Sequence, residues 1–143
     1  MPFPLITGFN VIITNALQNR IIDQIHVNYF FRAAMGNKMK IAEILLDKGA
    51  DIEAKNMMDL TPFLIAVIHG SKETAEMLLD RGANLMAIDS AHNGCLHLAV
   101  IHKRKEILQM LLDRGKGKLM ELRNNELKSV IHLAACNEEM EVN

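Results

Sequence analysis

A leucine pair recurs at a fixed interval of thirty-three residues, at Leu45-Leu46, Leu78-Leu79 and Leu111-Leu112. The surrounding text repeats as well, as ILLDKGAD (44–51), MLLDRGAN (77–84) and MLLDRGKG (110–117). A period of this length, with one leucine pair and one glycine per unit, is typical of a stacked repeat array. Each unit of such an array has an apolar face that only a neighbouring unit can cover. The sequence therefore predicts a solenoid and not a single globular core.

Composition and charge narrow the class of protein further. Of the 143 residues, 50% are hydrophobic and 23% are charged, which is typical of a folded soluble chain. The net charge of −1 gives no long-range attraction to nucleic acid or anionic lipid, so neither a nucleic-acid partner nor direct membrane insertion is expected. No apolar stretch reaches the roughly 18 residues of a membrane span, and the amino terminus lacks the basic region of a secretory signal. We expect a cytoplasmic location, with the nucleus as the alternative.

The clearest unit runs from Asn56 to Ile88, and its local signals fit a helical hairpin. Thr61 can cap a helix, and Pro62 suits the first turn. Gly70 and Gly82 suit the left-handed residues that end the two helices. With Thr61-Pro62-Phe63, Ala66, the leucine pair and Gly82-Ala83-Asn84, the unit resembles the ankyrin repeat, whose usual text runs T-P-L-H, A-A, L-L and G-A-D. The resemblance covers nearly the whole chain and implies an all-α solenoid of stacked helix-turn-helix units joined by hairpin loops.

This frame divides the chain into five segments. It predicts an incomplete N-terminal repeat with a second helix only (1–22), repeats at 23–55, 56–88 and 89–123, and an incomplete C-terminal repeat (124–143). The third repeat carries a two-residue insertion after Gly115, and an unrelated capping helix is the alternative for residues 5–15. Two incomplete ends indicate a stretch of a longer array, or a shortened product of a larger gene. The helices are expected near residues 28–36, 38–48, 61–69, 72–81, 94–102, 104–114 and 129–137.

Three positions depart from the usual repeat text. Gly94 replaces the capping threonine, so the helix after it should be less firmly started. Asn37 and Lys103 stand where Gly70 ends its helix. Asparagine is the common second choice for left-handed geometry, whereas lysine would hold a positive φ at a cost of roughly 1 kcal/mol, unless the turn differs.

Six histidines raise the question of a metal site, and the repeat frame accounts for most of them. His97 and His132 fall at the histidine of the T-P-L-H motif, where the resemblance implies hydrogen bonding within and between repeats. His69 and His102 share another repeat position. Neighbouring units pack about 10 Å apart, which is too far for equivalent histidines to share a zinc ion with its four converging ligands. We expect no metal and no cofactor.

Catalytic residues are not expected either. The sequence motifs of zinc proteases, serine hydrolases and nucleotide-binding loops are absent. Cys95 and Cys136 read as small hydrophobes in a reducing compartment, without a disulfide. Asp47, Asp80 and Asp113 recur once per unit, which favours an exposed helix face. The basic residues around 103–105, with Lys116 and Lys118, indicate a solvated helix start; binding of phosphate or an acidic partner is the alternative.

The resemblance implies a non-enzymatic protein–protein interaction module. In such proteins a partner protein lies against the concave surface formed by the hairpin tips and the first helices. Two alternatives stay open: a structural segment of a larger array, such as the cytosolic part of a membrane channel or a scaffold, and an enzyme, which is the least supported. The chain itself is expected to be monomeric or to self-associate weakly through uncapped ends.

Carried over position by position, the binding surface has two parts. The hairpin tips contribute Lys55, Met57, Met58, Leu60, Ile88, Ser90, Ala91, Asn93, Arg123, Asn125, Glu126 and Lys128. The first helices contribute Met35, Ile68, His69, Ile101 and His102. Ile68 with His69 and Ile101 with His102 occupy equivalent positions on successive first helices, so the two pairs should lie side by side and be at least partly exposed. Apolar groups flanked by hydrogen-bonding groups suit a binding hot spot.

Overall fold

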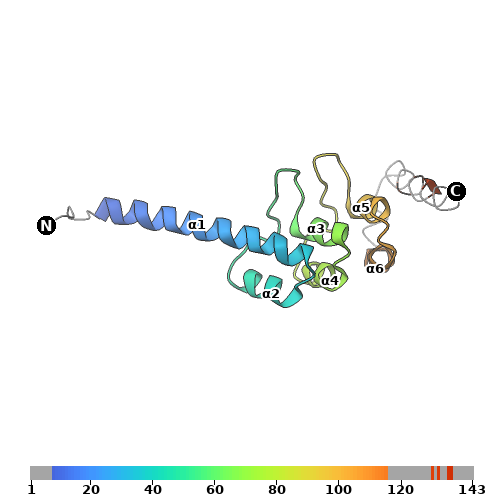
Figure 1. Ribbon diagram of the computed structural model, residues 1–143, viewed down its shortest axis with the longest axis horizontal. Coiled ribbons are helices and arrows are strands. Elements are labelled where there is room, and N and C mark those ends of the chain that lie inside the picture. Colours follow the sequence, from blue (N-terminus) through green and yellow to red (C-terminus); the bar gives the residue numbers. More distant parts are fainter. Residues whose placement is uncertain (1–7, 116–129, 131, 133–134, 137–143) are drawn as a thin grey trace.

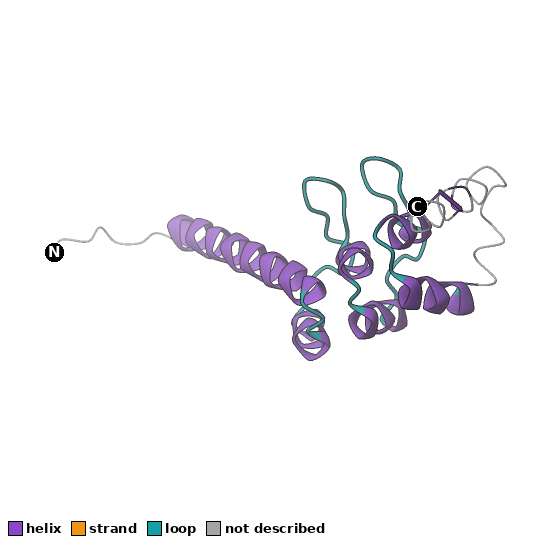
Figure 2. Cartoon of the chain, turned by 45° about the vertical axis from the view of Figure 1, so that its right-hand side comes forward, coloured by secondary structure: helices purple, strands orange, loops and turns teal. Residues whose placement is uncertain are grey.

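The computed structural model describes residues 8–115, together with 130, 132, 135 and 136, and side chains from residue 15 onward. Within these residues the chain forms six helices and no strand: α1 (Gly8–Met35), α2 (Met39–Asp47), α3 (Pro62–His69), α4 (Lys72–Asp80), α5 (Cys95–Ile101) and α6 (Lys105–Arg114). Figure 1 shows α1, α3 and α5 in one row and α2, α4 and α6 in a second row. The loops that follow α2 and α4 project together on one side, which Figure 2 shows from another direction. The predicted all-α solenoid of stacked hairpins is confirmed.

Most of the predicted helices are found within one or two residues of their expected bounds. The exception is the helix expected to begin at residue 28, because α1 begins at Gly8 and runs without a turn to Met35. The separate helix expected within residues 5–15 is therefore wrong. Residues 15–28 contain neither glycine nor proline, so nothing in the backbone interrupts the helix there. The repeat boundaries themselves remain a prediction; the insertion after Gly115 and most of the helix expected at 129–137 lie outside the described residues.

The start of α3 follows the expected local chemistry. Thr61 has extended backbone geometry, and its hydroxyl accepts a hydrogen bond from the Leu64 amide at 3.3 Å. Pro62 occupies the first helical position, where its missing N–H leaves no hydrogen bond unmade. The predicted cap of this helix is confirmed, and it fixes the direction in which the preceding loop enters the stack.

The turn after each first helix uses one left-handed residue. Its φ is 55° at Asn37, 73° at Gly70 and 57° at Lys103, at three equivalent repeat positions. Of the two outcomes left open for Lys103, a strained positive φ or a different turn, the structure shows the positive φ. The backbone conformation is conserved along the stack although only Gly70 adopts it without steric cost.

The core lies between the two rows of helices. Its fully buried side chains include Phe30, Phe63, Leu64, Leu78, Ile107 and Leu111. Helix α3 packs between α1 and α5, and α4 packs against α2. Val130 is also helical and buried with this core. The middle hairpin, α3 with α4, is thus covered on both sides.

Polar contacts between neighbouring hairpins repeat with the same period. The Ser71 hydroxyl donates to the Met35 carbonyl at 3.2 Å, and Arg104 Nε at the equivalent position donates to the Ile68 carbonyl at 2.8 Å. On the outer row, Arg81 pairs with Asp47 at 2.7 Å and Arg114 with Asp80 at 2.6 Å. The recurring aspartates do form an exposed face, and there they link successive second helices.

Candidate partner-binding surface

Each of the two described hairpin tips is organised by a single side chain. Asn56 Oδ1 accepts the backbone amides of Met58 (2.9 Å) and Leu60 (3.0 Å). At the equivalent position of the second tip, Asp89 Oδ1 accepts the amides of Ala91 (2.9 Å) and Asn93 (2.8 Å). Such side-chain acceptors stabilise tight turns in place of backbone carbonyls. The tips are therefore ordered loops with the same backbone.

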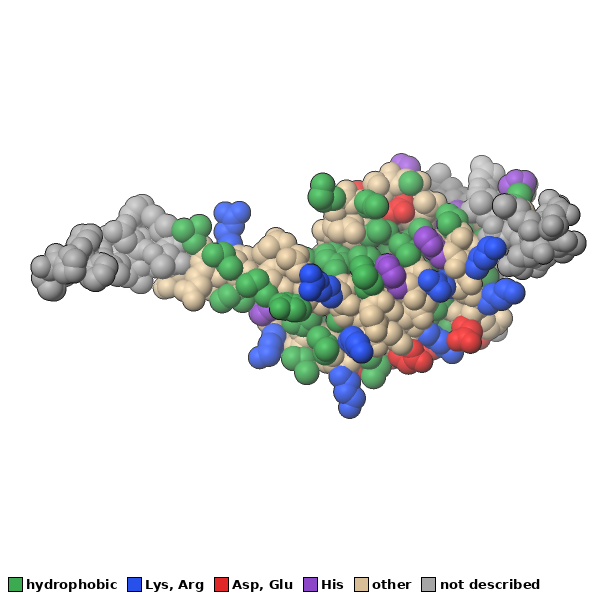
Figure 3. Space-filling view, viewed as in Figure 1, with side chains coloured by type: hydrophobic (Ala, Val, Ile, Leu, Met, Phe, Trp, Pro, Cys, Tyr) green, Lys and Arg blue, Asp and Glu red, His purple; other side chains and the backbone are tan. Residues whose placement is uncertain are grey.

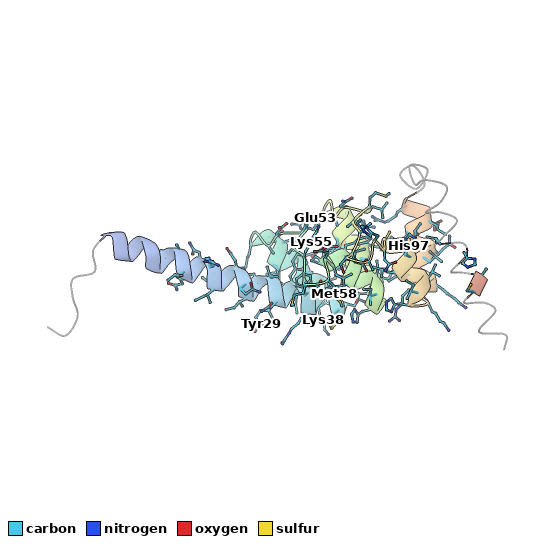
Figure 4. The ribbon with its side chains drawn as sticks, turned by 90° about the horizontal axis from the view of Figure 1, so that it is seen from above. Tyr29, Lys38, Glu53, Lys55, Met58 and His97 are labelled. Atoms are coloured by element: carbon cyan, nitrogen blue, oxygen red, sulfur yellow. The ribbon has the colours of Figure 1, made fainter. Side chains whose placement is uncertain are left out.

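The two tips are also tied to each other. The Ser90 amide donates to the Met58 carbonyl at 3.0 Å. Nearer the base of the loops, the Asn84 amide donates to Glu53 Oε1 at 2.7 Å. A carboxylate accepting from a backbone amide makes a comparatively strong hydrogen bond. The tips consequently form one continuous edge along the stack; Figure 4, which looks down on them, shows Glu53, Lys55 and Met58 around the first tip.

Most of the tip residues expected on the binding surface are exposed. Met57 is fully exposed, Met58 and Ile88 are about half exposed, and Lys55, Ser90 and Ala91 are also exposed. Asn93 is half-buried, and its side-chain amide and its backbone amide both donate to Asp89. The remaining tip positions, Arg123, Asn125, Glu126 and Lys128, lie outside the described residues.

Leu60 is a correction. Only 8% of it is exposed, so it belongs to the core and offers no contact surface to a partner. Its amide bonds Asn56 Oδ1, and it directly precedes the Thr61 cap. This closure of the loop turns the leucine inward against the stack. The repeat frame placed Leu60 on the exposed hairpin tip, but the exposed part of the tip ends one residue earlier, at Asp59.

The first helices present a column of apolar residues at equivalent positions. Met35 and Ile101 are almost half exposed, and Ile68 between them is half-buried. His69 and His102 are exposed beside them. The Nδ1 of His69 lies 3.0 Å from the Ile65 carbonyl, so that ring nitrogen donates to its own helix. The predicted partial exposure of both isoleucines is confirmed, and Figure 3 shows histidine and hydrophobic side chains adjoining on one face of the stack.

His97 has a structural role that the sequence only partly indicated. The Gly94 amide donates to His97 Nδ1 at 3.3 Å. The imidazole thus satisfies one free amide at the start of α5, where no capping hydroxyl is present. This contact agrees with the hydrogen-bonding role that the resemblance implied.

The two cysteines differ in environment. Cys95 is buried, its thiol lies 3.4 Å from the Leu85 carbonyl, and burial raises its pKa to about 12. A thiol with this pKa is almost entirely protonated near neutral pH and is a poor nucleophile. Cys136 is half-buried, and its Sγ lies 3.7 Å from His132 Nε2. That contact was not anticipated, although the spacing of four residues on a helix was visible in the sequence.

Metal-ligating groups and cavities were the other candidates for a site in the described residues. Among them, no group of three or more His, Cys, Asp or Glu side chains is placed to hold a metal ion. A shallow cavity of about 290 Å³ lies at the start of α6, beside Lys72, Lys103 and Lys105. Arg104 also lines it, but its Nε donates to the Ile68 carbonyl. The two other basic residues expected there, Lys116 and Lys118, lie outside the described residues.

Stacked helical hairpins with loops aligned along one edge define a solenoid repeat protein. None of the helices in the described part of the chain is long and apolar enough to cross a membrane. The sequence matches the family model for ankyrin repeats in three copies, over residues 10–89 and again over residues 30–124. The chain therefore belongs to the ankyrin repeat family. No curated protein matches it significantly. Ankyrin repeats are generally protein–protein interaction modules and are typically not enzymes.

Proposed function

We propose that this chain is a non-enzymatic module that holds a partner protein against the concave surface made by its hairpin tips and first helices. The observation that carries the proposal is the exposure of large apolar side chains on ordered backbone, at Met57, Met58, Ile88 and Ile101. Contiguous exposed apolar surface marks interaction sites more often than chance. The cytoplasm is the location we expect, because a reducing compartment suits two free cysteines.

The chemistry of the surface favours a protein ligand over a small molecule. Methionine side chains are flexible and polarisable, so Met57 and Met58 can adapt to an irregular apolar partner surface. The surface is open, whereas sites for small molecules are usually concave pockets that bury most of the ligand. Polar groups such as Lys55 and His102 border the apolar side chains, as in the rim of a protein interface.

Order in the tips lowers the cost of binding. Asn56 and Asp89 hold the two loops in the same conformation, and the Ser90–Met58 hydrogen bond joins them. A surface that is already ordered loses less conformational entropy when a partner binds. Rigid tips therefore allow a modest apolar area to give useful affinity.

A pair of matched variants tests the proposal. Met57→Ser with Met58→Ser removes apolar surface from the first tip, and Leu112→Ser removes an exposed apolar group from α6 in the outer row. In affinity capture from the native source, followed by binding measurements on the purified partner, the tip variant should lose the partner and the outer-row variant should retain it. The tip variant and the outer-row variant should both have the same unfolding midpoint as the original chain.

A second variant pair extends the test to the first helices. The double variant Ile68→Ser with Ile101→Ser should bind the same partner with lower affinity. The chain should stay folded, because both side chains are partly exposed. Partner binding that survives both the tip and the helix variants would overturn the proposal. It would place the interface on another face, such as the outer helices. Capture of no partner at all would favour the alternative, a structural segment of a larger array with no partner of its own.

A further inference from the structure

The second hairpin tip ends on a dipeptide that can react with itself. Asn93 is the one asparagine of the sequence that is followed by glycine. In any chain, three bonded atoms separate the side-chain carbonyl carbon of an asparagine from the backbone nitrogen of the next residue, so attack by that nitrogen closes a five-membered ring. Glycine has no Cβ to hinder such a close approach. Asn93-Gly94 is therefore the asparagine site at which ring closure meets the least steric hindrance.

The fold places a base beside this dipeptide. The Gly94 amide donates to His97 Nδ1 at 3.3 Å across the first turn of α5, where Figure 4 labels His97. A backbone amide only donates, so Nδ1 carries a lone pair and the ring proton resides on Nε2. A general base acts on a proton within hydrogen-bond reach, at about 2.6–3.2 Å or somewhat more before the reacting groups tighten. The attacking nitrogen thus directs its proton at a neutral imidazole.

The side chain that would be attacked also closes the tip. Asn93 Nδ2 donates to Asp89 Oδ2 at 3.4 Å, and the Asn93 backbone amide donates to Asp89 Oδ1 at 2.8 Å. The Asp89 amide in turn donates to the Asn93 carbonyl at 3.0 Å. One of these three hydrogen bonds requires an uncharged carboxamide at position 93, because a carboxylate has no proton to donate.

We propose that Asn93 deamidates spontaneously in the folded chain, with His97 as the general base. The Gly94 nitrogen bonds to Asn93 Cγ while His97 Nδ1 takes its proton. The Cγ–Nδ2 bond then breaks, and the proton passes from His97 to Nδ2, which leaves as ammonia. Water opens the cyclic imide at either carbonyl and gives aspartate or isoaspartate. Each chain consumes one water and releases one ammonia, so this is a single event on the chain and not turnover of a substrate.

Two other asparagines of the loops serve as internal controls. Asn56 and Asn84 also accept backbone amides through Oδ1. Met57 and Leu85 follow them in the sequence, and their side chains crowd the nitrogen that would attack. Asn56 and Asn84 should therefore persist while Asn93 converts.

The product would change the tip. An aspartate in place of Asn93 sets a second carboxylate against Asp89 Oδ2, so two like charges replace a hydrogen bond. An isoaspartate also adds one carbon to the main chain at the point where the loop closes. Both products should loosen the loop that carries Ile88, Ser90 and Ala91. This consequence, unlike the reaction, rests on the proposed function: the altered chain should bind its partner more weakly.

Two substitutions test the base and the dipeptide separately. His97→Gln retains an acceptor for the Gly94 amide but cannot take up its proton, so it should slow deamidation of the folded chain at least about tenfold. Gly94→Ala adds a Cβ that would lie 3.8 Å from His97 Nδ1 and 3.9 Å from the Ala87 carbonyl, which are ordinary contacts. Since the φ of Gly94 is −88°, alanine fits without strain. That variant should stay folded, as thermal unfolding can verify, and should also react more slowly.

The full chain and both variants are incubated at neutral pH, and peptide mass spectrometry follows the exchange of ammonia for water at Asn93. Conversion in the original chain that both variants slow is the expected result. Asn93 that persists in the folded chain but converts in urea would overturn the proposal, because the fold would then protect the dipeptide. An unchanged rate in His97→Gln would overturn the role of the imidazole. These rates involve no partner, so they stand apart from the proposed function; equal partner affinity of converted and fresh chain would overturn only the consequence for binding.

Discussion

The first hairpin, α1 with α2, and the middle hairpin, α3 with α4, occupy equivalent places in the repeat but differ in what covers them, and α1 is also much longer than α3. Ile44 on α2 is 53% exposed, whereas Met77 at the equivalent position on α4 is 6% exposed. Tyr29 is likewise exposed and its counterpart Pro62 is buried. Positions that face the next hairpin, such as Leu45 and Leu78, are buried in both. Burial in this fold therefore depends on the neighbour as much as on the residue.

This difference has an energetic consequence. In a linear array, stability is approximately the sum of each unit's own stability and its contacts with adjacent units. The middle hairpin has two such contacts within the described residues, and the first hairpin has one. Substitutions in the middle hairpin should therefore cost more than the same substitutions at equivalent positions of the first.

The largest expected effect is the loss of a fully buried leucine. Leu78→Ala should lower the free energy of unfolding by about 2–5 kcal/mol, because the cavity is enclosed on all sides. Leu45→Ala at the equivalent position should cost less, since 8% of Leu45 is exposed whereas Leu78 is fully buried. Chemical denaturation measures both losses. Equal losses would contradict the idea that the middle hairpin is stabilised more strongly by its neighbours than the first hairpin.

Alkaline pH should destabilise the third hairpin through Cys95, which stands at the position equivalent to Tyr29. Burial raises the pKa of this thiol from 9.0 to about 12, so the folded chain keeps a proton that the unfolded chain releases. Between those two values stability falls as pH rises, by roughly 1.4 kcal/mol per pH unit from this group. Cys95→Ala should lack that slope when unfolding is measured from pH 8 to 11. A slope that persists in the variant would assign the effect to another group.

Glycine substitutions at two equivalent left-handed positions, Asn37 and Lys103, should change the stability of the chain in opposite directions. Lys103→Gly should stabilise the chain by roughly 1 kcal/mol by relieving a strained positive φ. Asn37→Gly relieves the same strain but removes the acceptor for the Thr74 amide and hydroxyl, at 3.1 and 2.9 Å. Leaving buried polar groups unsatisfied costs about 1–3 kcal/mol, so the net change should be a loss. Thermal unfolding of the two variants measures both signs.

Asn37 should also lower the pKa of the Glu73 carboxyl group. Its amide donates to Glu73 at 2.7 Å, and this hydrogen bond is the main reason why the pKa of Glu73 lies below its usual value. In Asn37→Gly the pKa of Glu73 should rise toward that value in an NMR titration. An unchanged pKa would show that the hydrogen bond between the two hairpins does not form in solution.

The smallest expected effect is at the uncovered face. Ile44→Ser should change stability by no more than about 0.5 kcal/mol, as for other exposed positions. Met77→Ser at the buried equivalent should cost several times more, because it places a hydroxyl in the core and leaves a cavity. A large loss at Ile44 under dilute conditions would indicate that something covers α2 in solution.

Much of the fold could be predicted from local signals. The period, the Thr61 cap and the left-handed turn at Gly70 predicted the bounds of α3 and α4. The prediction was wrong at α1, where the repeat period was extended into a stretch without any stop signal. It was wrong at Leu60 too, because side-chain direction at the end of a loop depends on how the loop closes. The hydrogen bonds of Asn56 and Asp89 that order the tips were not foreseen, since they link residues outside any helix.

The sequence by itself determined that this chain is a stack of ankyrin repeats, because the information for a hairpin is contained within each unit of thirty-three residues and is repeated. Only the tertiary structure decided which apolar residues stay in water. Tyr29 and Ile44 are exposed, although Pro62 and Met77 at the same positions of the next repeat are buried. Burial requires a second surface, and whether one is present is a property of the whole assembly. That is the physical reason why the repeat text predicts the hairpins but leaves the surfaces open to partners undetermined.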